Sequence, residues 1–145
     1  MRILLGVDDS KYSGNALRAI ITQFQTENTE IRVLHVLQPL TLTAPPEMAP
    51  GYIPELDVQK EPARELVERT ANELRKAGFK ADTAVEIGDA RVVIVDAAAK
   101  WGADLIVVGS HGLRGILSLM LGSVAESVAR HARCSVEIVR TAVRN

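Results

Sequence analysis

Short apolar runs alternate along the chain with longer segments whose apolar residues recur every three or four positions. A run of four to eight apolar residues between turn residues is typical of a buried strand, and alternation of apolar and polar residues is typical of a half-buried one. These patterns predict five strands, at residues 3–7, 31–37, 81–87, 105–108 and 136–139.

The intervening segments have the periodicity and the end signals of four helices. We expect Ser10 to cap the first helix and Pro62 to occupy the first turn of the second, which ends at Gly78. We expect Gly88 and Asp89 to cap a third helix that runs to Trp101, and the fourth covers residues 123–131. The predicted order is therefore βαβαβαβαβ.

Residues 38–60 interrupt this regular pattern. The segment contains Gly51 and five of the six prolines of the chain, which are Pro39, Pro45, Pro46, Pro50 and Pro54. So much proline disfavours a regular helix or a central strand, and we predict a long Pro-rich loop. Such a loop is either a lid or interaction segment, or plain disorder.

Strands that alternate with helices of these lengths predict an α/β fold, with parallel strands joined by right-handed crossovers and helices on both faces. We expect one domain over residues 1–145, built on an open, twisted, five-stranded parallel sheet of Rossmann-like type. Ligands of such sheets bind beyond the carboxyl ends of the strands, where the strand order reverses. Asp8 and Gly109, which follow the first and fourth strands, should therefore be neighbours across a crevice.

Composition narrows the classes of partner. The net charge is −1, from 17 Lys+Arg against 18 Asp+Glu, so we expect neither nucleic acid nor a membrane as a partner. Only 3% of the residues are aromatic, which leaves little for binding by stacking. The lone Cys134 excludes an intrachain disulfide, and without an apolar leader or span the sequence predicts a cytoplasmic protein.

The glycines after the fourth strand suggest phosphate binding. Gly109, Gly112 and Gly122 would let the backbone approach an anion closely, and glycine also tolerates positive φ. Ser123 adds a hydroxyl and an amide at a helix N-terminus, where unpaired N–H groups favour negative charge. Ordinary turn chemistry is the alternative for the glycines, and His111 either donates to a phosphate or points to solvent.

At this point the sequence resembles the universal stress protein family, in its ATP-binding subgroup, over essentially the whole chain. Three motifs carry the resemblance. They are Val7-Asp8-Asp9-Ser10 followed by Tyr12-Ser13 and Ala16-Leu17, then Leu34-His35-Val36, and finally Gly109-x2-Gly112-x9-Gly122-Ser123.

The resemblance implies ATP as the ligand and an adenine nucleotide alpha hydrolase-like fold. Asp8 and the backbone of Val36, with Val7 in the same motif, would hold the adenine and ribose. The phosphates would lie on Gly109, Gly112, Gly122, Ser123 and the amide of Val124, with His111 in the same loop. Since no cluster of side chains has the spacing of metal ligands, any Mg²⁺ would arrive with the nucleotide phosphates. The resemblance also implies a homodimer that pairs through the last strand, from Val136 to Arg140.

These observations predict an ATP-binding universal stress protein that acts as a nucleotide-dependent stress or energy sensor. No catalytic residue is assigned, because only Asp8, Asp9 and His111 could serve as a general base. Two alternatives stay open. One is a slow ATPase, and the other is an interaction module with a vestigial nucleotide site.

Overall fold

The computed structural model contains one five-stranded sheet and four helices, and it describes residues 1–39, 54–111 and 121–140. The strands are β1 (Arg2–Gly6), β2 (Glu30–Leu37), β3 (Lys80–Ile87), β4 (Leu105–Gly109) and β5 (Ser135–Val139). The helices are α1 (Lys11–Gln23), α2 (Pro54–Lys76), α3 (Ala90–Trp101) and α4 (Ser123–His131). The predicted order of strands and helices is confirmed.

The sheet has the strand order β3-β2-β1-β4-β5, and all its pairs are parallel. Leu5 of β1 lies beside Val33 of β2 and Val107 of β4. The chain therefore adds strands on one side of β1 first and then on the other. This reversal places the predicted crevice beyond the carboxyl ends of β1 and β4.

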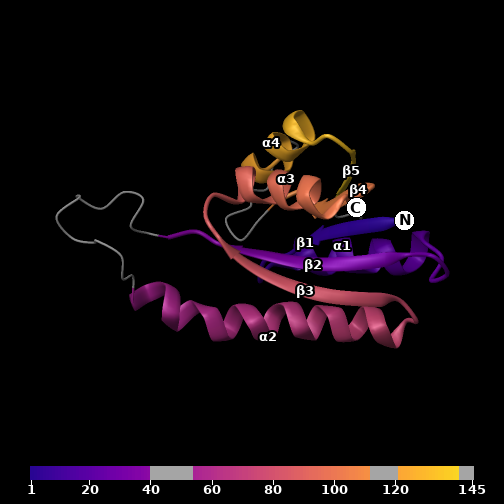
Figure 1. Cartoon of the computed structure of the whole chain (residues 1–145), viewed down its shortest axis with the longest axis horizontal. Coiled ribbons are helices and arrows are strands. Elements are labelled where there is room, and N and C mark those ends of the chain that lie inside the picture. The colour runs from indigo at the N-terminus through magenta and orange to yellow at the C-terminus, as the bar shows by residue number, and fades with distance from the viewer. Residues whose placement is uncertain (40–53, 112–120, 141–145) are drawn as a thin grey trace, which may run out of the picture.

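Two apolar layers hold the helices to the sheet, with α1 and α2 on one face and α3 and α4 on the other (Figure 1). Successive strand residues point to opposite faces, so Ile3 and Leu5 pack with α1 and α2, while Leu4 packs with α3 and α4. The open α/β architecture with helices on both faces is confirmed.

The predicted helix ends are confirmed for α3 but not for the start of α2. Asp89 is the N-cap of α3 and accepts a hydrogen bond from the Arg91 amide at 3.0 Å, and Gly102 ends that helix in the left-handed region. The start of α2 was predicted wrongly, because the helix begins at Pro54 and contains Pro62 in its interior. The Pro-rich loop is therefore shorter than residues 38–60, and its residues 40–53 lie outside the described residues.

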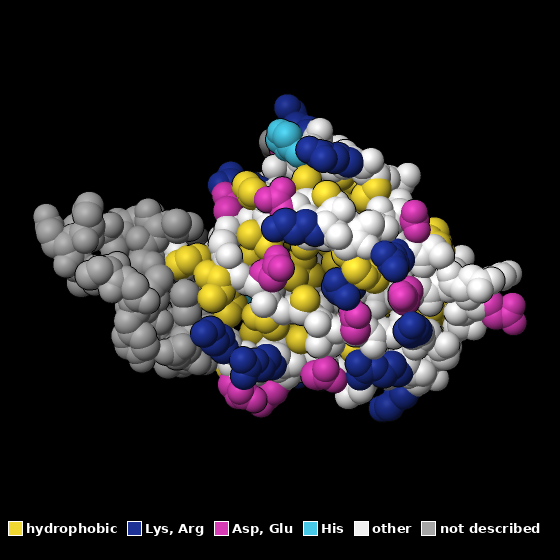
Figure 2. All heavy atoms as spheres, in the orientation of Figure 1, with side chains coloured by type: hydrophobic (Ala, Val, Ile, Leu, Met, Phe, Trp, Pro, Cys, Tyr) yellow, Lys and Arg dark blue, Asp and Glu magenta, His cyan; other side chains and the backbone are white. Residues whose placement is uncertain are grey.

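The surface around these layers is mixed in charge. Figure 2 shows Lys and Arg side chains interspersed with Asp and Glu, and hydrophobic side chains between them. Of the helices in the described ranges, none has the length and apolar character needed to cross a membrane.

Candidate functional site

The crevice begins where the chain leaves β1. The Val7 amide still donates to the Leu34 carbonyl of β2 at 2.9 Å, and the Val7 carbonyl lies 2.7 Å from Nδ1 of His35. Because a carbonyl oxygen only accepts, Nδ1 of His35 carries the proton and donates. Val7 is thus buried, with both of its backbone groups bonded to β2, and the next residue, Asp8, lies at the end of the sheet.

Asp8 is half-buried and held by two hydroxyl groups from the start of α1. Its Oδ1 accepts hydrogen bonds from Ser10 and from Ser13, the latter at 3.0 Å, and its amide donates to Ser13 Oγ at 2.7 Å. Ser10 stands at the N-cap position, but its side chain makes no capping bond. The predicted capping role of the Ser10 side chain was wrong, since the nearby carboxylate competes for its hydroxyl proton.

Val36, near the end of β2, lies beside the turn that contains Asp8. Gly6 is opposite Leu34, so the register continued by two residues brings Asp8 beside Val36. The Leu34 carbonyl faces β1, and backbone groups alternate in direction along a strand. The amide and carbonyl of Val36 therefore face the space beyond β1, where that strand has already ended.

Gly109 is the last residue of β4, and α1 packs directly on it. A Cβ at this position would lie 2.7 Å from Cβ, 2.8 Å from the carbonyl oxygen and 2.9 Å from the carbonyl carbon of Tyr12. Gly109 is not among the glycines with positive φ. The structure therefore gives this glycine a packing requirement, namely close approach of the Tyr12 backbone.

Ser110 joins the end of β4 to the start of α4. Its amide donates to Val139 of β5 at 3.0 Å, and its carbonyl accepts from the Gly122 amide at 2.7 Å. Ser110 and Gly122 therefore lie together, although eleven residues separate them in sequence. Gly112 is outside the described residues.

The N-terminus of α4 faces this junction. Gly122 is the N-cap, with a φ of −63°, and its carbonyl accepts the first intrahelical hydrogen bond, from the Glu126 amide. The amides of Ser123 and Val124 precede that bond and have no acceptor within the helix. Ser123 is exposed and Val124 is half-buried against the α3 and α4 layer. This helix end can stabilise an anion.

His111 lies against the first turn of α1. Its ring centroid is 5.1 Å from that of Tyr12, and its Nδ1 is 3.1 Å from Ser110 Oγ. Sequence reasoning included Tyr12 and Ser13 in a motif but not among the site residues. Their positions on the first turn of α1, four and five residues after Asp8, were the available signal.

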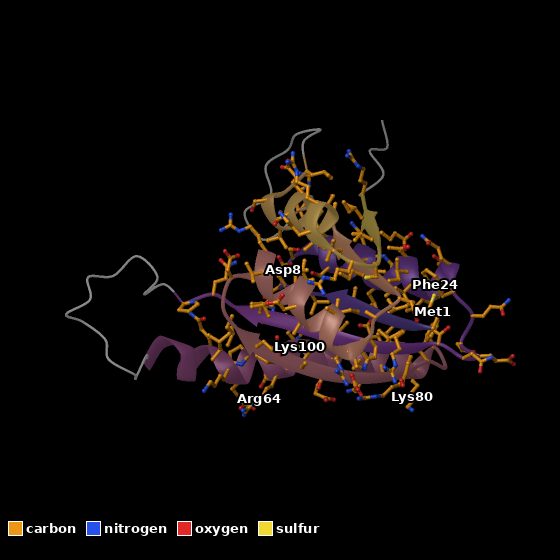
Figure 3. The ribbon with its side chains drawn as sticks, turned by 45° about the horizontal axis from the view of Figure 1, so that its top comes forward. Met1, Asp8, Phe24, Arg64, Lys80 and Lys100 are labelled. Carbon is orange, nitrogen blue, oxygen red and sulfur yellow. The ribbon has the colours of Figure 1, made fainter. Side chains whose placement is uncertain are left out.

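Asp8 thus lies at the opposite end of β1 from Met1, on the side where α4 begins (Figure 3). In the described ranges, no group of three or more His, Cys, Asp or Glu residues could hold a metal ion. Burial raises the pKa of the Cys134 thiol, which does not favour a reactive thiolate.

A small open parallel sheet whose strand order reverses beside β1 places this chain among the Rossmann-like α/β proteins. The chain belongs to the universal stress protein family, whose sequence profile matches residues 1–140. It is 31% identical to the universal stress protein YxiE of Bacillus subtilis, over 96% of this chain and 98% of the relative. It is 32% identical to Sll1388 of Synechocystis, over 96% and 97% of the two chains.

Solved structures confirm the fold. The protein MJ0577 superposes with a TM-score of 0.84 at 28% identity, over 99% of this chain and 97% of that one. A universal stress protein from Archaeoglobus fulgidus in complex with dAMP has a TM-score of 0.69 at 24% identity, over 96% and 97%. Two further family members of similar fold, at 20% and 22% identity, were solved with AMP and cAMP.

The close contact at Gly109 yields a stability prediction. We expect Gly109→Ala to lower the free energy of unfolding by roughly 1–3 kcal/mol, since the added methyl group meets backbone atoms that cannot turn aside. Urea denaturation measures this change. Gly14→Ala in α1 is the control, because a Cβ there would lie 3.6 Å from the end of the Arg18 side chain, and a helical Gly→Ala change should stabilise by about 0.5–1 kcal/mol. Equal stability of the Gly109 variant and the wild type would contradict the packing described above.

Proposed function

We propose that this chain binds an adenine nucleotide, ATP, across the ends of β1, β2 and β4, and that nucleotide occupancy makes it a stress or energy sensor. The observation that carries the proposal is the junction at Gly109 and Ser110. Through Tyr12 it holds the Asp8 turn on one side, and through Gly122 it holds the N-terminus of α4 on the other. A carboxylate and an anion-stabilising helix end thus border one crevice.

The phosphates belong at the N-terminus of α4. The amides of Ser123 and Val124 and the Ser123 hydroxyl are the groups that we assign to them, with His111 beside the same junction. The Gly122 amide already donates to Ser110, so it is not assigned to a phosphate. Gly109 acts by admitting α1. Mg²⁺ would reach the site on the phosphates themselves.

The nucleoside belongs between Asp8 and Val36. A carboxylate held by Ser10 and Ser13 through Oδ1 is a rigid acceptor, and ribose or amino protons are its natural donors. The Val36 amide and carbonyl beyond the end of β1 offer one donor and one acceptor to a base edge. Family members of the same fold solved with dAMP, AMP or cAMP support an adenine nucleotide in this assignment.

Ser123→Glu tests the phosphate half. The wild type should bind ATP in the micromolar range, about −7 to −8 kcal/mol, in isothermal titration. A glutamate at the first position of α4 stabilises the helix dipole but repels phosphate, so ATP affinity should fall by at least about tenfold while adenosine affinity stays unchanged.

The control for Ser123→Glu is Ala129→Glu, an exposed position later in the same helix, which should leave ATP binding unaltered. If ATP bound the Ser123 variant as tightly as the wild type, the phosphates would lie elsewhere. If the wild type gave no heat with ATP, the proposed function would be wrong.

We also propose a homodimer through β5, at the edge of the sheet. The Val139 carbonyl faces β4, so the alternating backbone groups of Val136 and Ile138 face outward. A second β5 can pair with these outward groups.

Ile138→Pro tests the pairing, because proline removes an outward N–H and leaves the bonds to β4 in place. Sedimentation should find the wild type at twice the chain mass and the variant at the chain mass, with unchanged circular dichroism. Ile138→Ala shortens the side chain but keeps the N–H group, and it should stay dimeric. A folded proline variant that remains a dimer would exclude pairing through β5.

A further inference from the structure

The opposite edge of the sheet carries a second feature, which is unrelated to the crevice. β3 is a strand of eight residues that, among the described residues, pairs with β2 and lies at the edge of the sheet. The Gly88 amide bonds to Leu37 of β2, so even-numbered positions face β2 and odd-numbered positions face outward. Ala81, Thr83, Val85 and Ile87 therefore direct their amides and carbonyls away from the sheet.

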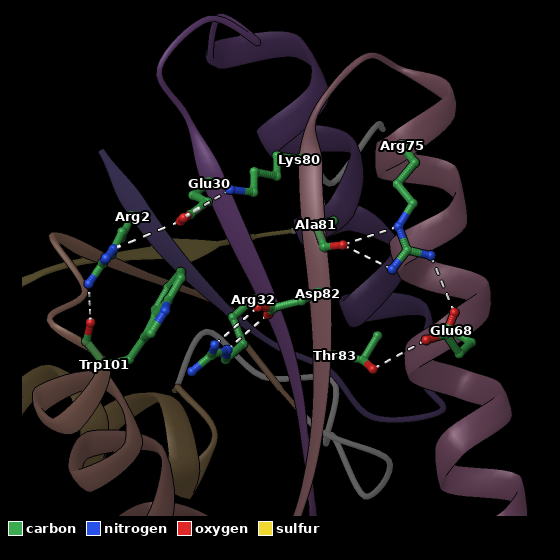
Figure 4. Close-up of polar contacts among 10 residues, drawn as sticks. All are labelled: Arg2, Glu30, Arg32, Glu68, Arg75, Lys80, Ala81, Asp82, Thr83 and Trp101. Atoms are coloured by element: carbon green, nitrogen blue, oxygen red, sulfur yellow. Dashed lines mark hydrogen bonds and ion pairs between the residues drawn. The ribbon is translucent and has the colours of Figure 1, made fainter.

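Side chains of α2 close the first half of this edge. The guanidinium group of Arg75 donates to the outward carbonyl of Ala81 at 2.9 and 3.1 Å. Arg75 also lies 3.3 Å from Glu68, whose carboxylate accepts a bond of 3.3 Å from the Thr83 hydroxyl (Figure 4). Covering an edge with charged side chains is a common protection against strand pairing.

The second half of the edge has no such cover within the described part of the chain. A groove of about 370 Å³ follows it instead, with Thr83, Val85 and Ile87 on the strand side and Lys60, Arg64 and Val67 on the helix side. Ile87 is 47% exposed at the end of the strand. This half of β3 thus combines outward backbone groups, an apolar floor and a cationic wall.

We propose that this groove binds an extended acidic peptide segment of a partner protein, which adds to β3 as a further strand. The outward groups of Val85 and Ile87 would supply main-chain hydrogen bonds, which is the usual basis of strand addition. Every second side chain of the peptide would enter the groove between Val67 and Val85.

The two cationic side chains of the groove, Lys60 and Arg64, favour a partner that carries carboxylates. Lys60 and Arg64 lie one turn apart on α2, so a carboxylate entering the groove would meet both, although each of the two cations already has a partner within the protein. Arg64 is 3.7 Å from Glu61, but both side chains are more than half exposed, so this pair contributes little and can give way. The groove carboxylate, Glu68, is already engaged by Arg75 and Thr83.

A second copy of this chain fits the groove less well. The outward-facing residues of its own β3 are Ala81, Thr83, Val85 and Ile87, none of which carries a carboxylate for Lys60 and Arg64. A separate acidic segment would bond to the outward backbone groups of β3 and would also place carboxylates near Lys60 and Arg64.

A displayed library of random peptides, each about ten residues and long enough for one strand, tests the proposal. The library is selected on the wild-type protein and depleted on a Lys60→Glu, Arg64→Glu double variant. We expect recovered peptides that alternate apolar and acidic residues and bind the wild type at least about tenfold more tightly than the double variant, because two attractive charges have become repulsive. Lys76→Glu, a charge reversal in the last turn of the same helix, should bind as the wild type does.

Val85→Pro, which removes one outward N–H from an edge strand, should weaken the same peptides by a similar factor. The proposal is overturned if no recovered peptide distinguishes the wild type from the double variant, if the recovered peptides are basic, or if the amide resonances of Val85 and Ile87 do not shift on binding. Pairing of β3 with a second copy, seen as a dimer that Val85→Pro dissociates, would also overturn it. No readout uses a nucleotide, so the result is independent of the function proposed for the crevice.

Discussion

The site depends on one close contact, between the end of β4 and the first turn of α1. Gly109 has no side chain, so the backbone of Tyr12 can lie where a Cβ would otherwise be. This contact holds the first turn of α1 against β4, and the N-cap and first turn of that helix supply the two hydroxyl groups that hold Asp8. The residue after Gly109 accepts the hydrogen bond that places Gly122 and α4. Two adjacent residues, Gly109 and Ser110, therefore set the two borders of the crevice.

Several polar groups in this junction already form hydrogen bonds within the protein, so they are not available to a ligand. The Gly122 amide is used by Ser110, the Val7 carbonyl by His35, and Oδ1 of Asp8 by two serines. What remains for a nucleotide is a smaller set, chiefly the amides of Ser123 and Val124 and the backbone of Val36. Such bonds within the protein hold the remaining groups in position before binding, which lowers the ordering cost of association.

The order of strands and helices could be predicted from the sequence because apolar periodicity reports burial directly. The bounds of α4, 123–131, were predicted correctly, and the Asp89 cap was recognised from its position before a periodic segment. The start of α2 could not be read in the same way. Both Pro54 and Pro62 suit a first helical turn, and an interior proline removes only one backbone donor from a helix of 23 residues. Since Ala63, Val67, Ala71 and Leu74 anchor this helix to the sheet, it tolerates that loss.

The packing at Gly109 and the hydroxyl groups around Asp8 could not be predicted, because both depend on contacts that exist only once α1 lies against β4. The sequence interpretation assigned glycine to anion approach and positive φ, whereas Gly122 has an ordinary φ of −63°. The motif thus has a packing requirement at Gly109 in addition to the binding role that we propose for it. The spacing of glycines along the chain does not distinguish a glycine needed for packing from one needed for binding.

The most direct test of the crevice is a titration of the ¹⁵N-labelled wild-type chain with ATP, followed through its amide resonances. Our account predicts that the largest shifts occur at Ser123 and Val124 of α4 and at Asp8 and Val36 on the nucleoside side. Adenosine should move only the Asp8 and Val36 resonances. Shifts confined to other parts of the sheet, or none at millimolar ATP, would contradict the assignment of this crevice to an adenine nucleotide.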